Sequence, residues 1–410
     1  MLWTAAIGSG AAIVGFAKLA DATLAFFFSI TSSRPWLPFL LGPLVGMLVV
    51  WLTNRYFPGS QGSGIPQVIA ARRLAIQGHA VDSLVSLRIA AGKIFLGAFA
   101  LIGGFSAGKE GPSVQVSASI LHFLHRFSPY SRVIRPSDLI LAGGAAGIAA
   151  AFNTPLAGIV FAVEELGRKL ETRTSGVLLS TIILAGLVSM ALMGNYTYFG
   201  HLKVDNVGPG IVLPVISGGI LCGLLGGAFS QLLLWPQKMP HLALWRWRAA
   251  HPVQFAGGCG LLVAGIGWLS GGVSFGSGYI VTAKAITGET ILPWYASIAR
   301  FLATITTYYS GIPGGIFAPA LAIGASLGSN VANFLGVGGS AIPFMALCMA
   351  GFLAAATQAP ITSAIIVMEM VDGHAMVISL MAIALISKAV SARLGPELYQ
   401  QLSRPFYLGR

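Results

Sequence analysis

Three short stretches that combine glycine with proline decide the fold of this chain: GSGIP at residues 62–66, GKEGP at 108–112 and GIFAP at 315–319. Each stretch interrupts apolar sequence, and a new helical run follows each of them, over residues 67–76, 113–127 and 320–334. Proline is favoured in the first turn of a helix because its missing N–H is no loss there. The three stretches therefore predict helix N-termini that are buried in apolar surroundings.

Such buried N-termini have a chemical consequence. A helix N-terminus exposes unpaired N–H groups and carries about half a positive charge. A single break is most simply explained as a kink that neighbouring side chains fill. Three breaks together favour an anion site, in which converging N-termini satisfy their donors with the ion and hold it without a full positive charge that would trap it.

The composition predicts that these surroundings are a membrane. The chain has 410 residues, a mean hydropathy of +0.81, 55% hydrophobic residues and 9% charged ones. Soluble domains carry roughly 25% charged residues, so this outer surface must face lipid. Residues 2–30, 174–200 and 211–235 are each long and apolar enough to span a bilayer. We expect an all-α polytopic membrane protein whose first segment is a retained helix and not a cleaved signal peptide.

The net charge of +12 does not indicate nucleic acid, because the basic residues are scattered and many lie at the ends of predicted spans. Two basic clusters are typical of cytoplasmic loops. They comprise Arg168, Lys169 and Arg173, and Lys238, Arg246 and Arg248.

No metal site is predicted. Cys222, Cys259 and Cys348 lie in apolar runs without paired spacing, so we interpret them as small packing residues. His122 and His125 lie one helical turn apart, but no acidic residue or cysteine nearby in the sequence would complete a set of ligands.

The chain also contains an internal repeat. AAAFNTPL at residues 149–156, leading to Glu164, matches AAATQAPI at residues 354–361, leading to Glu369, half a chain length later. The stretches GKEGP and GIFAP align at a similar offset. Duplicated halves are common in transporters whose sites form from broken helices where the repeats meet.

Together the motifs and the segment at 149–165 resemble the CLC family of chloride channels and chloride/proton antiporters, over roughly residues 10–400. The resemblance implies a CLC-type fold of two inverted-topology repeats with many tilted and broken helices, assembled as a homodimer with one pore per subunit. We expect one transmembrane domain over residues 1–410, with repeats at about 1–195 and 205–405. The matching filter residues are Gly62, Ser63, Gly64, Ile65, Pro66, Gly108, Lys109, Glu110, Gly111, Pro112, Gly315, Ile316, Phe317, Ala318 and Pro319.

The resemblance also implies a chloride site. Ser63 matches the serine whose hydroxyl coordinates the central chloride, and Ile316 and Phe317 match residues whose backbone N–H groups face the same ion. Tyr399 matches the tyrosine whose hydroxyl completes the site, although the sequence around it departs from the usual family pattern. The alternative for Tyr399 is an anchor at the membrane interface.

Glu110 is the most informative side chain. A carboxylate at a buried helix N-terminus can occupy the anion site itself, so chloride and ionised Glu110 should compete and protonation should release the side chain. The resemblance implies the same role, since Glu110 matches the external gating glutamate of the family. The alternative is a capping glutamate with no role in transport.

Glu165 matches the internal glutamate that transfers protons to and from the cytoplasm in many exchangers of the family. A plain salt bridge with Arg168 or Lys169 is the alternative. Glu164 lies about 100° away around the same helix, so the sequence leaves open which of the two carboxylates faces the proton path.

The chain departs from the family pattern after the first motif. Gln67 and Ile69 stand where some bacterial relatives have acidic residues, which leaves Lys93 without an obvious acidic neighbour. The chain ends soon after Tyr399, where many eukaryotic relatives continue into nucleotide-binding modules. The resemblance therefore favours a bacterial type in the inner (plasma) membrane.

These observations predict a secondary transporter that exchanges chloride for protons across the membrane and needs no cofactor. The alternatives are a passive chloride channel with the same pore and an exchanger for nitrate or fluoride; Ser63 favours chloride. An intramembrane enzyme would need a nucleophile–base set or metal ligands, and neither pattern is present. The expected partners are a second copy of the chain, chloride, protons and the lipid bilayer.

Overall fold

A computed structural model describes residues 2–125, 127, 134–167, 172–194, 197–200, 209–336 and 341–408. Over these residues the chain is helical throughout, and its only β-pairing is two isolated bridges. The predicted all-α fold is confirmed.

In chain order the elements are α1 (Leu2–Thr31), α2 (Pro38–Tyr56), α3 (Ile65–Ile76), α4 (Leu87–Ala100), η1 (Leu101–Gly103), α5 (Glu110–His125), α6 (Pro136–Phe152), α7 (Pro155–Phe161), η2 (Ala162–Gly167), α8 (Thr172–Met193), η3 (Pro209–Ile211), α9 (Val212–Lys238), α10 (Ala243–Ala250), α11 (Pro252–Leu269), α12 (Tyr279–Ile286), α13 (Ala296–Ser310), α14 (Phe317–Phe334), α15 (Ala341–Thr357), α16 (Pro360–Met370), η5 (His374–Met376), α17 (Val377–Leu394), α18 (Leu398–Ser403) and η6 (Arg404–Phe406).

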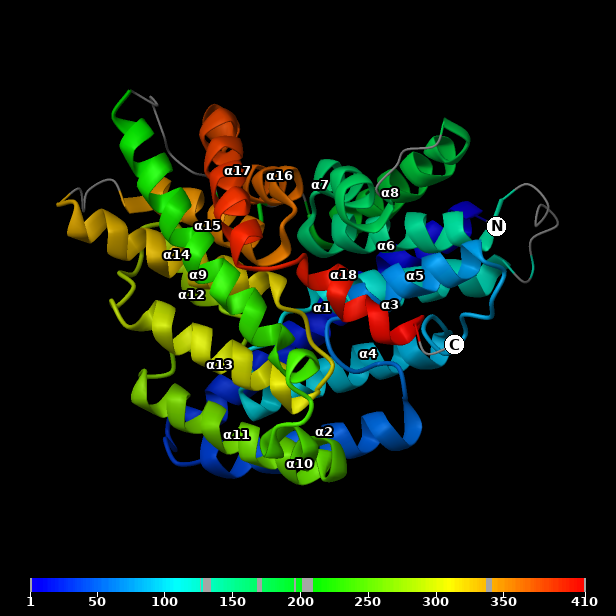
Figure 1. Cartoon of the computed structure of the whole chain (residues 1–410), viewed down its shortest axis with the longest axis horizontal. Coiled ribbons are helices and arrows are strands. Elements are labelled where there is room, and N and C mark those ends of the chain that lie inside the picture. The colour runs from blue at the N-terminus through cyan, green and yellow to red at the C-terminus, as the bar shows by residue number, and fades with distance from the viewer. Residues whose placement is uncertain are drawn as a thin grey trace.

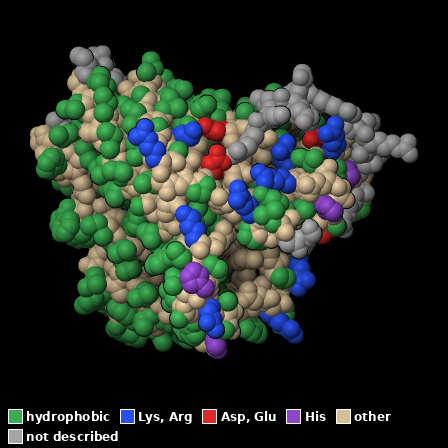
Figure 2. Space-filling view, in the orientation of Figure 1, with side chains coloured by type: hydrophobic (Ala, Val, Ile, Leu, Met, Phe, Trp, Pro, Cys, Tyr) green, Lys and Arg blue, Asp and Glu red, His purple; other side chains and the backbone are tan. Residues whose placement is uncertain are grey.

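Within the described ranges, six helices are long and apolar enough to cross a membrane: α1, α2, α8, α9, α11 and α17. Large apolar side chains on them face outward, including Leu213, Trp268 and Ile378. Figure 2 shows hydrophobic side chains along the margin of one face, whereas lysine and arginine side chains gather nearer its centre. Because all six helices expose large apolar side chains, they require lipid around them.

The predicted spans 2–30 and 211–235 are confirmed as α1 and α9, whereas the prediction of a span over 174–200 was too long. The helix α8 ends at Met193, and Gly194 follows it with a positive φ of 87°. Glycine adopts this left-handed conformation without the penalty that a Cβ imposes, which is why it ends helices so often.

The helices that follow the three glycine–proline stretches start inside the molecule (Figure 1). Their helical runs begin two or three residues earlier than the sequence predicted, so each motif proline lies in the first turn of α3, α5 or α14. The helix α3 has 12 residues and a length of about 18 Å, which is too short to cross a bilayer of about 30 Å. Its N-cap is Gly64, whose φ of 96° is available to glycine at little cost.

The internal repeat is visible as two equivalent broken helices. Asn153 ends α6 with a φ of 58° and Gln358 ends α15 with a φ of 63°, and a proline then starts α7 and α16. The helix α5 packs along α6 in the way that α14 packs along α15. The same local sequence therefore makes the same break twice, while the repeat boundaries near 195 and 205 stay a prediction.

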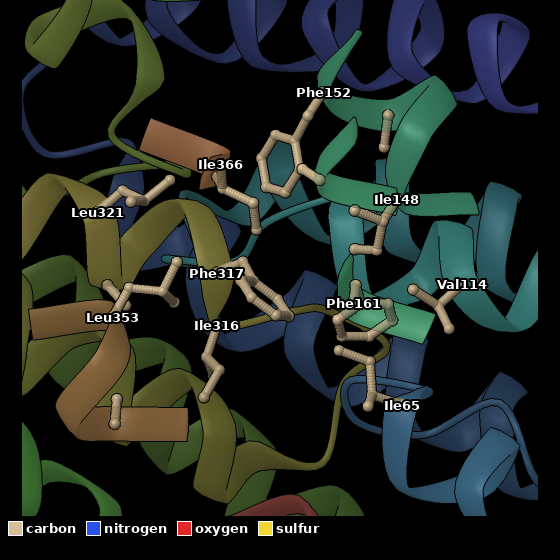
Figure 3. Packing of buried hydrophobic residues seen from close by; sticks show 14 of the residues in the cluster. Ile65, Val114, Ile148, Phe152, Phe161, Ile316, Phe317, Leu321, Leu353 and Ile366 are labelled. Carbon is tan, nitrogen blue, oxygen red and sulfur yellow. The ribbon is translucent and has the colours of Figure 1, made fainter. Parts of the chain in front are cut away.

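The hydrophobic core surrounds the breaks. Figure 3 shows the ring of Phe317 among Phe152, Phe161 and Ile316. Its centroid lies 6.2 Å from that of Phe152 and 6.1 Å from that of Phe161, in edge-to-face contacts. Aromatic pairs of this geometry contribute about 0.5–1.5 kcal/mol beyond their buried area. The first residue of α14 is therefore fixed by packing against α6 and α7, the two parts of the broken helix of the first repeat.

Candidate functional site: an anion site at converging helix N-termini

Backbone hydrogen bonds bring the three glycine–proline stretches together. Gly62 donates its N–H to Ile312 O (3.1 Å), and Gly314 donates to Gly62 O (3.0 Å). Gly108 and Gly315 exchange two bonds of 2.8 and 2.7 Å in an antiparallel bridge. Because each stretch leads into its helix within a few residues, these bridges place the N-termini of α3, α5 and α14 around one point.

The first residues of α14 supply backbone donors to that point. Ile316 is the N-cap and Phe317 the first helical residue, so their N–H groups have no acceptor within the helix. Both residues are buried. The ring of Phe317 stacks on that of Tyr399 with a centroid distance of 6.0 Å and an interplanar angle of 25°. The structure thus brings Phe317 and Tyr399 together, while their role in binding chloride stays a prediction.

Two buried hydroxyl groups complete the site. Ser63 is 3% exposed and Tyr399 is fully buried, and neither hydroxyl has a hydrogen-bond partner among the described residues. The two hydroxyls lie near one another, but their geometry is not that of a hydrogen bond. An unsatisfied buried hydroxyl costs about 1–3 kcal/mol, so an anion that accepts from both groups would recover this penalty. The donors therefore suit a halide ion.

Tyr399 owes its position to the short helix α18, which lies against α3 and α9 in front of the centre of the molecule (Figure 1). The next residue, Gln400, fixes this helix: its side-chain oxygen accepts from Arg73 Nη2 at 2.6 Å, and its side-chain nitrogen donates to Glu165 O at 3.4 Å. Tyr399 is therefore a core residue and not an interfacial anchor, which corrects the alternative considered from the sequence.

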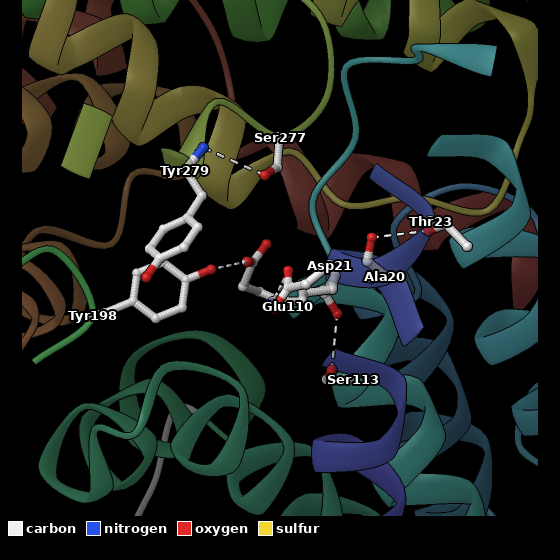
Figure 4. Close-up of polar contacts among 9 residues, drawn as sticks. Ala20, Asp21, Thr23, Glu110, Ser113, Tyr198, Ser277 and Tyr279 are labelled. Carbon is white, nitrogen blue, oxygen red and sulfur yellow. Dashed lines mark hydrogen bonds and ion pairs between the residues drawn. The ribbon is translucent and has the colours of Figure 1, made fainter. Parts of the chain in front are cut away.

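Glu110 is the first residue of α5 and is fully buried. Its Oε1 accepts a hydrogen bond from the hydroxyl of Tyr198 at 3.1 Å (Figure 4). The backbone amide of Ala318, in the first turn of α14, also interacts with this carboxylate. A Cβ at Gly108 would overlap Glu110 Oε2, so only glycine leaves room for the carboxylate here. The carboxylate thus lies between the N-termini of α5 and α14.

Lys109 points its charge away from this carboxylate pocket. Its Nζ lies 2.9 Å from Asp21 Oδ1 on α1, and the Asp21 side chain is about half exposed. An exposed ion pair of this kind contributes little to stability. Lys109 therefore lies between the buried Glu110 carboxylate and the half-exposed Asp21.

The structure separates the roles of the two neighbouring glutamates that the sequence could not distinguish. The Glu164 carboxylate accepts from the backbone N–H groups of Ile361 (3.1 Å) and Thr362 (2.6 Å), at the start of α16. In the equivalent place of the other repeat, the Glu369 carboxylate accepts from Ala157 N at 2.8 Å, at the start of α7. Glu164 is therefore a capping residue that joins the two repeats.

Glu165 is 4% exposed and lies in the π-helical segment η2. π-helical turns are rare and occur often at functional sites. Glu165 and Glu110 both lie within electrostatic range of the Tyr399 hydroxyl. Arg168 and Lys169, which the alternative salt bridge needs, lie outside the described residues. The geometry thus favours Glu165 over Glu164 for a role near the anion site.

The first glycine–proline stretch contacts a buried lysine side chain. Lys93 is 0% exposed, and its Nζ donates to the backbone oxygens of Gln61 (3.4 Å) and Gly62. Gln67 donates to the same Gln61 oxygen at 2.7 Å. No carboxylate pairs with Lys93 in the part of the chain that the structure describes. Its amino group therefore lies beside Gly62 and Ser63, where the charged form would attract an anion.

We expect Lys93→Met to weaken chloride binding. A unit charge near the ion contributes on the order of 1 kcal/mol or more at an effective dielectric constant of about 20, so its removal should lower the affinity roughly tenfold. Isothermal titration of the purified protein with chloride measures this change. Lys284→Met removes an equal charge from an exposed position on α12 and should leave the affinity unchanged. Equal affinities for the parent and a folded Lys93→Met variant would contradict this role.

A cavity of about 220 Å³ opens onto the site beside Ser63. Its lining includes polar groups from three parts of the chain: Gln61 and Gln67 around the first glycine–proline stretch, Arg248 on α10 and Tyr308 on α13. Arg248 belongs to one of the predicted cytoplasmic basic clusters, and its Nε donates to Tyr309 O at 2.7 Å. The cavity gives an ion a polar approach to the Ser63 hydroxyl.

The histidine pair has an acidic neighbour that comes from a distant part of the sequence. The sequence showed no acidic residue near His122, but its Nε2 lies 3.8 Å from Asp82 Oδ1, which a distant segment contributes. Across the described ranges, no group of three histidine, cysteine or acidic side chains is placed to hold a metal ion.

The fold and the site define the chain as an integral membrane protein with broken helices. Their N-termini converge on a pocket whose donor groups have no partner among the described residues. The family model described as "Voltage gated chloride channel" matches residues 45–392. The chain therefore belongs to this family, the CLC family, which confirms the resemblance seen in the sequence.

Known relatives include two transporters with the same name. The H(+)/Cl(-) exchange transporter ClcA of Cronobacter sakazakii is 32% identical over 391 residues, which cover 88% of this chain and 78% of that protein. The H(+)/Cl(-) exchange transporter ClcA of Yersinia pestis is 30% identical over 380 residues, which cover 88% of this chain and 75% of that protein.

Solved structures share the fold along the whole chain. A slow cyanobacterial Cl-/H+ antiporter superposes with a TM-score of 0.85 at 24% identity, covering 100% of this chain and 97% of that one. A CLC-type fluoride/proton antiporter gives a TM-score of 0.80 at 24% identity, covering 98% and 96%. The predicted CLC-type fold is thereby confirmed.

Proposed function

We propose that this protein exchanges chloride for protons across the membrane. The observation that carries the proposal is the burial of the Glu110 carboxylate at converging helix N-termini, beside the two unpaired hydroxyls of Ser63 and Tyr399. Membership of the CLC family and the names of the ClcA relatives support it. The named relatives are transporters, and the proposal includes no enzymatic step and no cofactor.

In this proposal, chloride accepts hydrogen bonds from the hydroxyls of Ser63 and Tyr399 and from the N–H groups of Ile316 and Phe317. All four are neutral donors whose partial charges add to the dipole of α14. Lys93 contacts the backbone oxygens of Gln61 and Gly62, and its charged form adds an electrostatic attraction for the chloride ion. A site of this kind holds the ion firmly enough to replace its hydration and weakly enough to release it.

Proton movement follows from competition at Glu110. The ionised carboxylate and chloride both need the donors at the N-termini of α5 and α14, so chloride that advances toward this pocket displaces the carboxylate. The displaced side chain takes up a proton, and the neutral acid no longer competes with the anion. Return of the carboxylate releases the proton, so one side chain links the two fluxes.

Glu165 provides the second proton position. It is buried on η2, and Glu165 and Glu110 share electrostatic contact with the Tyr399 hydroxyl. An ionisable group at membrane depth is costly and is a candidate for a proton relay. We assign Glu165 to proton exchange with the cytoplasm.

A passive chloride channel with the same pore is the second candidate, and an exchanger for another anion is the third. The fold shared with a fluoride/proton antiporter makes fluoride a candidate substrate, whereas Ser63 supports chloride as the substrate. Assembly as a homodimer and location in a bacterial inner membrane also belong to the proposal, with the family membership as their support.

Flux through reconstituted vesicles tests the proposal. The purified protein is placed in liposomes with a chloride gradient and no proton gradient, and chloride and proton movements are recorded together. We expect the chloride gradient to drive protons uphill in a fixed ratio. Chloride flux without proton movement would favour the passive channel over the exchanger. Proton movement driven by fluoride or nitrate but not by chloride would show that the exchanged anion is not chloride.

A further inference from the structure

Tyr198 is a buried residue outside the family motifs. It lies in the described segment 197–200 and is 3% exposed. The neighbouring Phe199 donates its backbone N–H to Met370 O at 2.8 Å, which anchors this segment to the end of α16. The segment therefore has a fixed place against the second repeat.

Two aromatic rings fix the direction of the Tyr198 side chain. The ring of Phe152 meets it edge to face at a centroid distance of 5.6 Å, and the ring of Tyr279 lies 4.5 Å away at 59°. In Figure 4 the hydroxyl of Tyr198 points at the Glu110 carboxylate. The distance from Tyr198 Oη to Glu110 Oε1 is 3.1 Å, and the bond is buried.

The other titratable groups near Glu110 are placed differently. Lys109 interacts with the carboxylate electrostatically but is engaged by Asp21. The Tyr399 hydroxyl lies within electrostatic range, on the side of Ser63. Tyr279 packs against the ring of Tyr198 and interacts electrostatically with Asp21. Tyr198 is thus the neighbour whose hydroxyl donates directly to the gate carboxylate.

We propose that Tyr198 is a positioning residue that holds the ionised Glu110 carboxylate in its buried position, so that the strength of this hydrogen bond sets how readily the gate leaves. The inference rests on the proposed exchange function. A donor favours the charged form of a carboxylate. Protonation of the Glu110 carboxylate and its displacement by chloride must therefore each overcome the hydrogen bond from Tyr198.

The change Tyr198→Phe removes the hydroxyl and keeps the ring. Without the donor the ionised carboxylate is less favourable, so a lower proton concentration suffices to protonate it. We expect the pH at which coupled transport is half-maximal to rise by about one unit, which is a tenfold change in proton affinity. The chloride concentration for half-maximal transport should fall in the same variant.

Three further variants separate positioning from packing. Tyr279→Phe removes a hydroxyl from the neighbouring ring and should leave the pH profile of the parent unchanged. In a Glu110→Gln background, which keeps chloride flux, Tyr198→Phe should leave the chloride concentration for half-maximal flux unchanged, because the group that the bond acts on is gone. Incorporation of 3-fluorotyrosine at position 198 keeps the shape and strengthens the donor, so the half-maximal pH should move down.

The outcomes distinguish this inference from the proposed function. If the parent protein shows no coupled transport, the exchange proposal fails and the role of Tyr198 fails with it. If the parent exchanges chloride for protons while Tyr198→Phe and the fluorinated protein keep its pH profile, the positioning role alone is overturned. A shift of equal size in Tyr279→Phe would attribute the effect to packing and would also overturn it.

Discussion

Replacing Glu110 with glutamine is expected to keep chloride flux and to reduce chloride-driven proton flux to that of protein-free vesicles. Glutamine has the shape of the protonated acid but never ionises, so it cannot compete with chloride for the N-terminal donors and cannot carry a proton. Paired chloride and pH recordings on liposomes measure both fluxes. The chloride flux should also lose its pH dependence, because the titrating gate is absent.

The matched control is Glu289→Gln, which removes a carboxylate from an exposed position after α12. It should leave both fluxes at the level of the parent. Proton transport that survives Glu110→Gln with its ratio to chloride intact would place the coupling elsewhere in the protein.

The second large effect is expected at Glu165. The variant Glu165→Gln should lose proton transport while chloride still moves, since the gate at Glu110 stays intact but has no buried partner to exchange protons with the cytoplasm. The same paired recordings apply, with the proton flux expected to fall much further than the chloride flux.

The adjacent Glu164 provides the control for this variant. Its carboxylate caps α16 through the amides of Ile361 and Thr362. Glutamine there should lower the stability of the folded protein by about 1 kcal/mol, as loss of a helix cap does, and should leave the ratio of protons to chloride unchanged. A loss of coupling in Glu164→Gln together with normal coupling in Glu165→Gln would reverse the assignment.

Much of the fold could be predicted because its determinants are local. The motif prolines Pro66, Pro112 and Pro319 each fall in the first turn of a helix, where proline is tolerated. The equivalent breaks after Asn153 and Gln358 arise from matching segments, so the repeat was visible in the sequence alone. The low content of charged residues predicted that the protein lies in a membrane. These signals need no knowledge of which helices are neighbours.

Side-chain partners depend on tertiary contacts and could not be predicted in the same way. The end of α8 precedes the segment that holds Tyr198, and nothing in that segment signals a bond to Glu110, 88 positions earlier. The backbone oxygens that Lys93 contacts carry no sequence signature. Glu164 could be distinguished from Glu165 only by its contact with the N-terminus of α16, which lies in the other half of the chain.

The residues of the chloride site were predicted by resemblance to a family, and the geometry adds a physical reason for them. Ser63 and Tyr399 come from segments far apart in the chain, and both hydroxyls are buried without partners among the described residues. Such groups persist in a folded protein when a ligand satisfies them. Their role in binding chloride is the prediction on which the mechanism depends.

Anomalous diffraction from crystals grown in bromide tests that prediction most directly. Bromide replaces chloride and marks its own position. A peak within hydrogen-bond distance of Ser63 Oγ, Tyr399 Oη and the backbone nitrogen of Phe317 is the expected result. No peak at that position under saturating bromide would contradict the account.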